Sequence, residues 1–262
     1  MSNQNSDPGL IREFKVDALA VRVFDGQESL GTAAARAASD FLSGRIRERG
    51  AARVILATGN SQIMFLKKLI ALNTIDWSRV TLFHMDEYLG IEANHKASFR
   101  HYLRERVEAL VHPRSFEFIS GDTLLPLKEC ERYTALLCAG PIDLCCLGIG
   151  ENGHIAFNDP PVADFADAPC LKIVKLDDDC KMQQVREAHF PGIEAVPPYA
   201  FTLTIPALCS AEKMICISPE RRKAKPVKSA LQGEISTRCP ASYLRTQPQA
   251  VLLLDTDSAS LL

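Results

Sequence analysis

The sequence lacks the features that direct a protein to a membrane or to a nucleic acid. No apolar stretch among its 262 residues approaches the length of a membrane span, and the polar segment 1–9 has no apolar core of a secretory signal. The formal net charge of −2 provides no basic field for a nucleic acid or an anionic membrane. The sequence therefore favours a cytoplasmic protein in which any anionic ligand is held by a local arrangement of residues.

Motifs for metals and nucleotides are also missing. The nine cysteines include no CxxC pair, and their odd number argues for reduced thiols rather than a disulfide framework. No HxH or HExxH spacing occurs and the cysteines lack the spacing of zinc ligands, so we expect no catalytic metal. The spacing of a P-loop or a dinucleotide fingerprint is absent as well, so no nucleotide cofactor is implied.

What the chain does contain is a regular alternation of apolar strand-like runs and helical patterns. Strands are predicted at 18–24, 53–57, 80–83, 142–146, 171–176, 201–205, 213–217 and 250–254, and helices at 28–49, 63–72, 98–110, 126–138 and 219–233. This order is typical of a doubly wound α/β fold, with a mainly parallel sheet and helices on both faces. Residues 1–262 are expected to form one domain, in which residues 1–12 are a flexible extension.

The segment 147–160, LGIGENGHIAFNDP, carries the densest chemistry in the chain. Three glycines fall within six residues, at Gly148, Gly150 and Gly153. This spacing, directly after an apolar strand-like run, favours a sharp turn at which the backbone approaches a ligand closely. His154 can transfer protons at neutral pH, and Asn158 and Asp159 follow it. An active-site loop is therefore favoured over a purely structural turn.

A second motif, Thr58-Gly59-Asn60-Ser61, connects a predicted strand to a predicted helix. The N-terminus of a helix offers unpaired N–H groups and a partial positive charge, which together favour a phosphate. Gly59 would let the backbone come close to a ligand, and Ser61 could donate its hydroxyl. Ser or Asn at this place is equally typical of an ordinary helix cap. The motif therefore predicts either a phosphate cradle or a structural cap.

The third motif, Asp86-Glu87, places two carboxylates directly after an apolar strand. A carboxylate at such a strand end can act as a base on a carbon next to a carbonyl group. In extended structure the two side chains face opposite ways, so that one reaches the ligand and the other supports it. The alternative is a solvated acidic turn. Because ligands bind at the carboxyl ends of strands in open α/β sheets, we expect the three motifs to meet.

Residues that would bind an anion are less clearly marked. The remaining histidines are expected to be surface or structural residues: His84, His95, His101, His112 and His189. The candidate cations are Lys172, Arg221, Arg222, Lys223, Lys225 and Lys228. The run 221–228 is most simply a solvated helix face, from which Lys223 could reach inward.

Taken together, the three motifs resemble those of the glucosamine-6-phosphate deaminase family. The matching segments are 57–61 (ATGNS), 83–88 (FHMDEY) and 147–160. The resemblance covers residues 20–257 and implies a Rossmann-like sheet of the deaminase/isomerase type. The related 6-phosphogluconolactonases usually show a DER run and a GHTAS element. This chain has Tyr88 and, at 155–157, IAF, which favours the deaminase branch.

The resemblance implies a metal-independent aldose–ketose isomerisation coupled to loss of ammonia, which converts glucosamine 6-phosphate to fructose 6-phosphate in amino-sugar catabolism. By this resemblance, Asp86 moves a proton between C2 and C1 of the opened sugar, and His154 helps to open the ring. Asp159 and Asn152 support the histidine. The family commonly has Glu at the position of Asp159, and some members have Asp at the position of Asn152.

By the same resemblance, the phosphate lies on the second motif. The residues implied to bind the substrate are Thr58, Gly59, Asn60, Ser61, Glu87, Gly150, Gly153, Lys172 and Lys223. Lys223 matches a family lysine that contacts phosphate, and Lys172 matches a position that often holds arginine. Val162 stands where regulated members have a serine of the activator site, which argues against activation by N-acetylglucosamine 6-phosphate.

Three alternatives stay open. They are a sugar-phosphate lactonase on the same fold, a deaminase or isomerase for another hexosamine phosphate such as the galacto epimer, and a sugar-phosphate sensor without enzymatic activity. A sensor of this kind normally carries a helix-turn-helix, for which the roughly twenty residues before the first strand are too few. The expected partner is a phosphosugar, without nucleic acid or membrane, and homo-oligomerisation is left open. The sequence leaves open whether a lid moves over the ligand, and segments 160–169 and 177–190 are the candidates for it.

Overall fold

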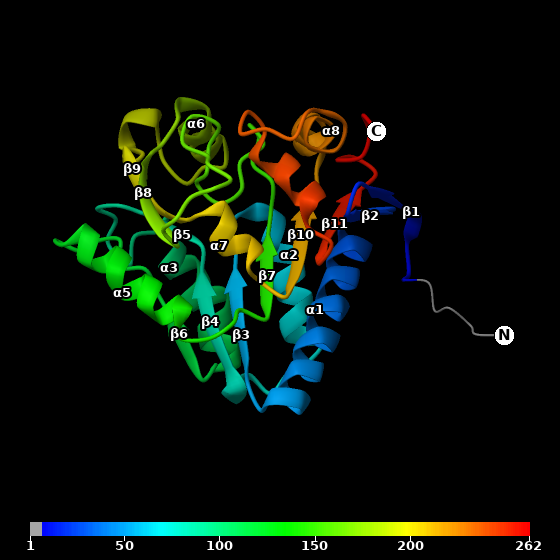
Figure 1. The fold of residues 1–262 in the computed structure, drawn as a ribbon, viewed down its shortest axis with the longest axis horizontal. Helices are drawn as coiled ribbons and strands as arrows, with labels where there is room; N and C mark the ends of the chain where they lie inside the picture. Colours follow the sequence, from blue (N-terminus) through cyan, green and yellow to red (C-terminus); the bar gives the residue numbers. More distant parts are fainter. Residues whose placement is uncertain (1–6) are drawn as a thin grey trace.

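A computed structural model describes residues 7–262 and places an eight-stranded sheet at the centre of the molecule (Figure 1). The strand order is β1-β2-β11-β10-β7-β3-β4-β6. The bounds are β1 Leu10–Val16, β2 Leu19–Phe24, β3 Ala52–Leu56, β4 Val80–His84, β6 Ser115–Glu117, β7 Leu144–Leu147, β10 Lys213–Ser218 and β11 Ala250–Asp255. β1 is antiparallel to β2, and all other neighbours are parallel, which confirms the predicted mainly parallel sheet.

The strand order reverses between two neighbouring strands at the middle of this sheet. From β3 the chain proceeds outward through β4 to β6, whereas from β7 it proceeds in the other direction through β10 to β11. Loops that leave such a pair of strands diverge, and they leave a crevice at the carboxyl ends. The fold therefore creates a place for a ligand between the ends of β3 and β7.

A second, antiparallel sheet stands beside this crevice. It consists of β5 Asp86–Tyr88, β9 Tyr199–Leu203 and β8 Leu171–Lys175, in the order β5-β9-β8. Only Met85 separates β5 from β4, so the small sheet grows out of the carboxyl end of the main one. The sequence analysis predicted strands at 171–176 and 201–205 but did not separate them from the main sheet. β9 ends earlier than predicted, because α7 begins at Ile205.

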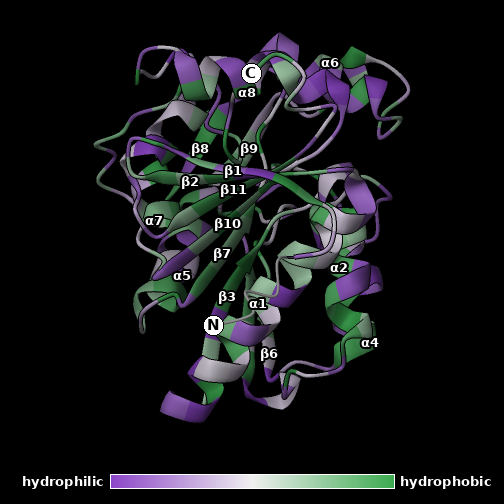
Figure 2. Cartoon of the chain, turned by 90° about the vertical axis from the view of Figure 1, so that its right-hand side faces the viewer, coloured by the Kyte–Doolittle hydropathy of each residue, from purple (hydrophilic) through white to green (hydrophobic). Residues whose placement is uncertain are grey.

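Helices cover both faces of the main sheet, as predicted. The α-helical and π-helical segments are α1 Gln27–Arg49, α2 Asn60–Ala71, α3 Phe99–Leu103, η2 Arg104–Glu108, α4 Ala109–Val111, α5 Pro126–Cys138, α6 Asp178–Arg186, α7 Ile205–Cys209 and α8 Ala224–Gln232. The 3-10 segments are η1 Trp77–Arg79, η3 Ile193–Ala195, η4 Arg221–Lys223 and η5 Pro240–Thr246. On one face of the sheet, α1, α2 and η2 pack through the buried side chains of Leu42, Phe65 and Val107. On the other face, α5 and α8 pack through Tyr133 and Val227, and Figure 2 shows the apolar strands between these layers.

The longest helix, α1, packs closely on the sheet because its buried face is made largely of alanine. Ala33, Ala34, Ala35 and Ala38 are all buried, and small side chains let the helix approach the strands. The helix ends at Gly50, whose φ of 77° lets its N–H turn back to donate to the carbonyl of Ile46. The chain then enters β3, the first strand whose end contributes to the crevice.

Three details depart from the sequence predictions. The predicted extension 1–12 is wrong for residues 10–12, which belong to β1, and residues 1–6 lie outside the described part. The predicted helix 98–110 is split into α3, the π-helical η2 and α4, and the predicted helix 219–233 starts as η4 before α8. Among the residues described, no helix has both the length and the apolar character needed to cross a membrane.

Candidate active site

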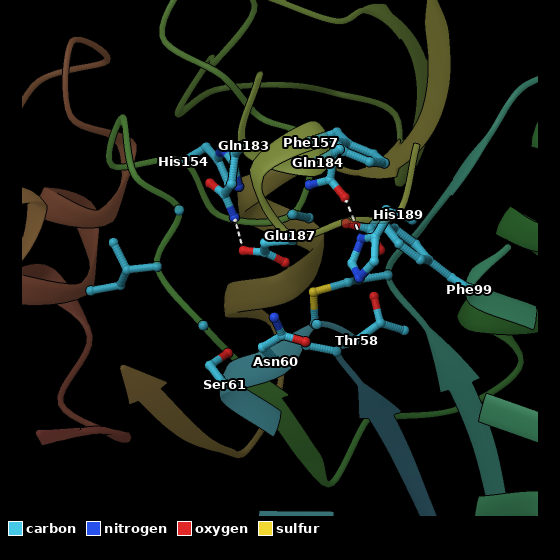
Figure 3. Close-up of a pocket in the computed structure, with 18 of the residues that line it drawn as sticks. Thr58, Asn60, Ser61, Phe99, His154, Phe157, Gln183, Gln184, Glu187 and His189 are labelled. Atoms are coloured by element: carbon cyan, nitrogen blue, oxygen red, sulfur yellow. Dashed lines mark hydrogen bonds between the residues drawn. The ribbon is translucent and has the colours of Figure 1, made fainter. Parts of the chain in front are cut away.

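A cavity lies at the carboxyl ends of β3, β4 and β7, where the strand order reverses (Figure 3). Its lining consists of Ala57, Thr58, Gly59, Asn60, Ser61, Met85, Asp86, Phe99, Gly148, Ile149, Gly150, His154, Ala156, Phe157, Gln183, Gln184, Glu187, His189, Arg222 and Lys223. All three sequence motifs contribute to it. Most of the predicted site residues therefore meet in one place, although they come from distant parts of the chain.

The floor of the cavity contains the start of α2. Gly59 is the N-cap residue, with a φ of 94°, and its position carries no side-chain capping bond. Asn60 and Ser61 lie inside the first turn of the helix, so the predicted alternative of a side-chain cap does not apply. The buried Gln62 fixes this turn against β7, because its amide donates to the carbonyl of Leu147 at 3.4 Å. A helix N-terminus whose first turn carries no acidic side chain thus borders the cavity and suits a phosphate.

Asp86 and Glu87 point to opposite sides of β5, as extended backbone requires. Asp86 lines the cavity and Glu87 does not. The buried Glu87 carboxylate accepts hydrogen bonds from the Ser98 hydroxyl at 2.7 Å and from the N–H groups of Phe99 and Arg100 at 3.1 and 3.0 Å. Glu87 therefore anchors the start of α3 and supports Asp86. Both side chains are buried, so the alternative of a solvated acidic turn is wrong.

The Asp86 carboxyl group is poised to exchange a proton. It is 7% exposed, and within residues 7–262 its Oδ1 has no hydrogen-bond partner. Burial raises the pKa of Asp86 well above its ordinary value, and the neighbouring Glu87 carboxylate raises it further. A carboxylate with a raised pKa is a stronger base than an ordinary aspartate, which suits removal of a carbon-bound proton.

His154 and Asp159 form a pair in the loop that follows β7. The imidazole lines the cavity, and its Nδ1 lies 2.8 Å from Oδ1 of the fully buried Asp159. Asn152 joins the two residues, since its amide donates to Asp159 at 2.9 Å and its carbonyl oxygen accepts from the His154 N–H at 3.0 Å. Burial opposes ionisation of Asp159, but the adjacent imidazole and the Asn152 amide hold its pKa below the ordinary value. Asp159 is thus a carboxylate that orients His154.

Gly150 and Gly153, in the loop after β7, play different structural roles. Gly150 lies against the imidazole, and a side chain at this position would overlap the ring of His154. The Gly150 N–H donates to the His154 carbonyl at 2.9 Å, which closes the turn. Gly153 has a φ of 85°, faces Cys239 and does not line the cavity. Gly150 therefore gives the histidine its place, whereas Gly153 shapes the turn and makes no wall for a ligand.

Lys223 brings a positive charge to the cavity from η4. It is almost completely buried, and burial together with the neighbouring Arg222 lowers the pKa of Lys223 to about 8. Arg222 also lines the cavity, but its guanidinium is already paired with Glu187 at 2.5 Å and Glu220 at 2.6 Å. Lys223 therefore reaches inward, as the sequence allowed, and is the cation best placed for an anionic ligand.

Lys172 does not reach the cavity. Its Nζ donates to the carbonyl of Val162 at 2.7 Å and to the carboxylate of Asp167 at 2.5 Å. Both partners belong to the loop 160–169, so the lysine ties this loop to β8. Lys172 is therefore absent from the cavity lining, and the phosphate contact that the resemblance implied for it stays a prediction.

Four polar residues that the sequence analysis missed form the wall opposite α2. Gln183 and Gln184 belong to α6, and Glu187 and His189 follow it; Figure 3 shows them facing Thr58, Asn60 and Ser61 across the cavity. Gln183 donates to Glu187 at 3.0 Å, and Nδ1 of His189 lies 3.0 Å from Oε1 of Gln184. His189, which we expected to be a surface or structural residue, thus lines the cavity. The only signal was the polar character of segment 177–190.

One group of side chains beside the cavity has the composition of a metal site. A ring nitrogen of His154, a carboxylate oxygen of Asp159 and Sγ of Cys180 all lie within 4.8 Å of one another. The three positions have no regular spacing in the sequence, so the spacing rules that led us to expect no catalytic metal could not detect this group.

Residues 25–253 match the family model described as "Glucosamine-6-phosphate isomerases/6-phosphogluconolactonase". A glucosamine-6-phosphate deaminase of Listeria monocytogenes serotype 4a (strain HCC23) is 32% identical over 207 residues, which cover 79% of this chain and 86% of the relative. A glucosamine-6-phosphate deaminase of Bacillus cytotoxicus is 31% identical over 241 residues, which cover 92% of this chain and 88% of the relative.

Two solved structures show the same fold. A monomeric glucosamine-6-phosphate deaminase superposes with a TM-score of 0.84 and 30% identity, covering 92% of this chain and 99% of its own. A 6-phosphogluconolactonase from Shewanella baltica OS155 superposes with a TM-score of 0.76, covering 92% of this chain and 100% of its own, but is only 17% identical. The second likeness concerns the fold alone.

Proposed function

This chain belongs to the glucosamine-6-phosphate isomerase/6-phosphogluconolactonase family, and we propose that it deaminates glucosamine 6-phosphate to fructose 6-phosphate and ammonia. The observation that carries the proposal is the presence of two separate proton-transfer groups in one cavity. Asp86 supplies a carboxylate with a raised pKa, and His154 supplies an imidazole oriented by Asp159. An isomerisation needs both, because the ring must open before a carbon-bound proton moves.

In the proposed mechanism, His154 first transfers the proton between O1 and the ring oxygen, which opens the sugar to the C1 aldehyde. Asp86 then removes the proton from C2 and returns it to C1, while the carbonyl oxygen O1 gains a proton and the C2 nitrogen loses one. The resulting C2 imine takes up water and releases ammonia, so that substrate and water become fructose 6-phosphate and ammonia. His154 thus serves ring opening, and Asp86 serves the transfer of the carbon-bound proton.

The phosphate is placed by the other end of the cavity. The first turn of α2, at Asn60 and Ser61, directs backbone N–H groups at the cavity, with Gly59 and Thr58 beside it. Lys223 adds the cationic charge. A phosphate held there would leave the sugar ring between Asp86 and His154, because these residues occupy the remaining wall formed by β5 and the loop after β7.

Hydrolysis of a sugar-phosphate lactone is the competing activity within the family, but it needs no proton transfer at C2. Lactone hydrolysis would leave Asp86 without a role in proton transfer. Asp86 nevertheless lines the cavity as a buried carboxylate, and within the described chain one of its oxygens has no hydrogen-bond partner. The relatives at 31–32% identity are deaminases, whereas the lactonase structure is at 17%. These findings favour the deaminase. The proposed specificity for the gluco rather than the galacto epimer rests on the relatives' names.

The test measures ammonia and fructose 6-phosphate from glucosamine 6-phosphate, with galactosamine 6-phosphate and 6-phosphogluconolactone run in parallel. Asp86→Asn is nearly isosteric and is expected to lower kcat by about 10²- to 10⁴-fold while the Kd for the phosphosugar changes little. A reaction in deuterated water should place deuterium at C1 of the product. Lactone hydrolysis that survives Asp86→Asn, together with no ammonia from either amino sugar, would overturn the proposal.

A further inference from the structure

The buried side of the His154–Asp159 pair contains a third potential ligand. Cys180, on the first turn of α6, places its Sγ within 4.8 Å of both a ring nitrogen of His154 and a carboxylate oxygen of Asp159. The three residues come from two segments, namely the loop after β7, which holds His154 and Asp159, and α6. Asp159 and Cys180 are fully buried, and His154 connects them to the cavity.

Polar atoms of this group are not satisfied by the rest of the described chain. Oδ2 of Asp159 is buried without a hydrogen-bond partner, and Nδ1 of His154 approaches Asp159 at 2.8 Å without the alignment of a straight hydrogen bond. Buried carboxylate oxygens normally have partners, since leaving one unpaired is costly. The Cys180 thiol, a weak donor, is the group that this carboxylate has beside it, and a metal ion that replaces the thiol proton would satisfy both residues.

We propose that His154, Asp159 and Cys180 bind a zinc ion and that zinc inhibits the enzyme. Imidazole nitrogen, carboxylate oxygen and thiolate sulfur are the three ligand types of protein zinc sites, whereas calcium and magnesium require mainly oxygen. Tetrahedral zinc holds neighbouring ligand atoms about 3.5 Å apart, so the Cys180 thiol needs to move inward by up to about 1 Å, whereas His154 Nδ1 and Asp159 Oδ1, which lie 2.8 Å apart, need to separate slightly. The Cys180 thiol loses its proton to the solvent on binding, and a water or the second oxygen of Asp159 fills the fourth position.

Inhibition follows from the ligands that zinc shares with the catalytic pair. Nδ1 of His154 faces the Asp159 carboxylate at 2.8 Å, so a zinc ion on this carboxylate would take Nδ1 and separate the two groups whose contact orients the imidazole for proton transfer. The ion would thus hold the ring and withdraw the carboxylate from it, without blocking the α2 end of the cavity. This inhibition rests on the proposed function, whereas zinc binding itself does not.

A second pair of thiols must be controlled in the experiment. Sγ of Cys138 and Sγ of Cys170 lie 3.6 Å apart, and Cys138 is exposed, so this pair could also collect zinc. All measurements therefore use Cys138→Ser as the parent protein. Cys180→Ser is then added to it, because serine keeps the size of the side chain and removes the soft ligand.

The metal-free proteins are equilibrated with buffered free zinc, and bound metal per chain is measured by atomic emission alongside ammonia release. The parent is expected to hold one zinc and lose turnover, and a chelator should restore it. With Cys180→Ser, turnover without zinc should persist, and the zinc concentration for half-inhibition should rise at least about tenfold. Unchanged zinc content and inhibition in Cys180→Ser would overturn the proposal.

Two further measurements test the zinc site. If Cys180→Ser does not fold, Asp159→Asn is measured for zinc content alone, and it should also lose the ion. Cobalt in place of zinc should give a thiolate-to-metal absorption band that disappears with Cys180→Ser. If the parent binds zinc through Cys180 but releases no ammonia from either amino sugar, the zinc site stands and the proposed function fails.

Discussion

Replacing Gly150 by alanine tests whether the position of the His154 ring sets the rate. A Cβ at Gly150 would have the imidazole as its three nearest atoms and would lie well inside van der Waals contact with it. Gly150 is not among the residues with positive φ, so alanine fits its backbone. The clash is therefore relieved by the ring, which must move by about 1 Å away from its place beside Asp159, and a misplacement of this size can cost about 10²-fold.

The expected result is a fall in kcat for ammonia release of about 100-fold, or about 2.7 kcal/mol in the activation barrier. The Kd for the phosphosugar should change little, because the α2 end of the cavity does not touch Gly150. Gly44→Ala, whose new Cβ would meet only the Arg47 side chain at 3.9 Å, serves as the matched control and should leave kcat unchanged.

A second measurement separates this local effect from misfolding. The melting temperature of Gly150→Ala should stay close to that of the parent, since the imidazole faces a cavity into which it can shift. Asp159→Asn added to Gly150→Ala should lower kcat by much less than Asp159→Asn alone, because both changes remove the same orientation of His154. Full turnover in Gly150→Ala, or strictly additive losses in the double variant, would refute the reasoning.

The titrating groups give two further predictions. With the pKa of Lys223 at about 8, KM for the phosphosugar should rise as the pH increases through this value, because the ammonium loses its charge, and Lys223→Met should show a raised KM without that inflection. Equal pH profiles for the two proteins would remove Lys223 from phosphate binding. Burial and the Arg100 charge lower the pKa of His84 from an ordinary value of 6.5 to about 3 in the folded protein. As the pH falls below 6.5, His84 becomes protonated in the unfolded chain but not in the folded protein. The free energy of unfolding therefore decreases as the pH falls from 6.5 towards 3. Urea unfolding at several pH values should show that the free energy of unfolding falls by about 1.4 kcal/mol per pH unit in this window. The fall should be smaller in His84→Gln, whose amide oxygen can still accept a hydrogen bond from the Ile119 N–H. Equal falls in the two proteins would contradict the assignment to His84.

The part of the site that lies at strand ends was predictable, because it depends only on where apolar runs end in the sequence. β3, β4 and β7 are buried on both faces and appear in the sequence as short apolar runs. The residues after each run must lie at the same edge of the parallel sheet. The division of labour between Asp86 and Glu87 followed from the two-residue period of a strand.

The parts that were missed depend on contacts between distant segments. β1 is an edge strand with mostly exposed side chains, and it is defined by pairing with β2 rather than by an apolar pattern. The inward direction of Gln183 and His189 depends on how α6 packs over the cavity. Lys172 could not be placed either, because its pairing with Asp167 is decided by the path of the loop 160–169.

The geometry also explains how the chain accommodates two departures from the family pattern at once. Asp159 is one methylene shorter than the usual Glu, yet its carboxylate lies 2.8 Å from the His154 ring. Asn152 makes this possible, because it binds the Asp159 carboxylate and the backbone of His154 together. An aspartate at position 152 would put a second negative charge beside the buried Asp159 and raise its pKa. A neutral amide avoids this and donates a hydrogen bond, so Asn152 keeps Asp159 ionised where it can orient the imidazole.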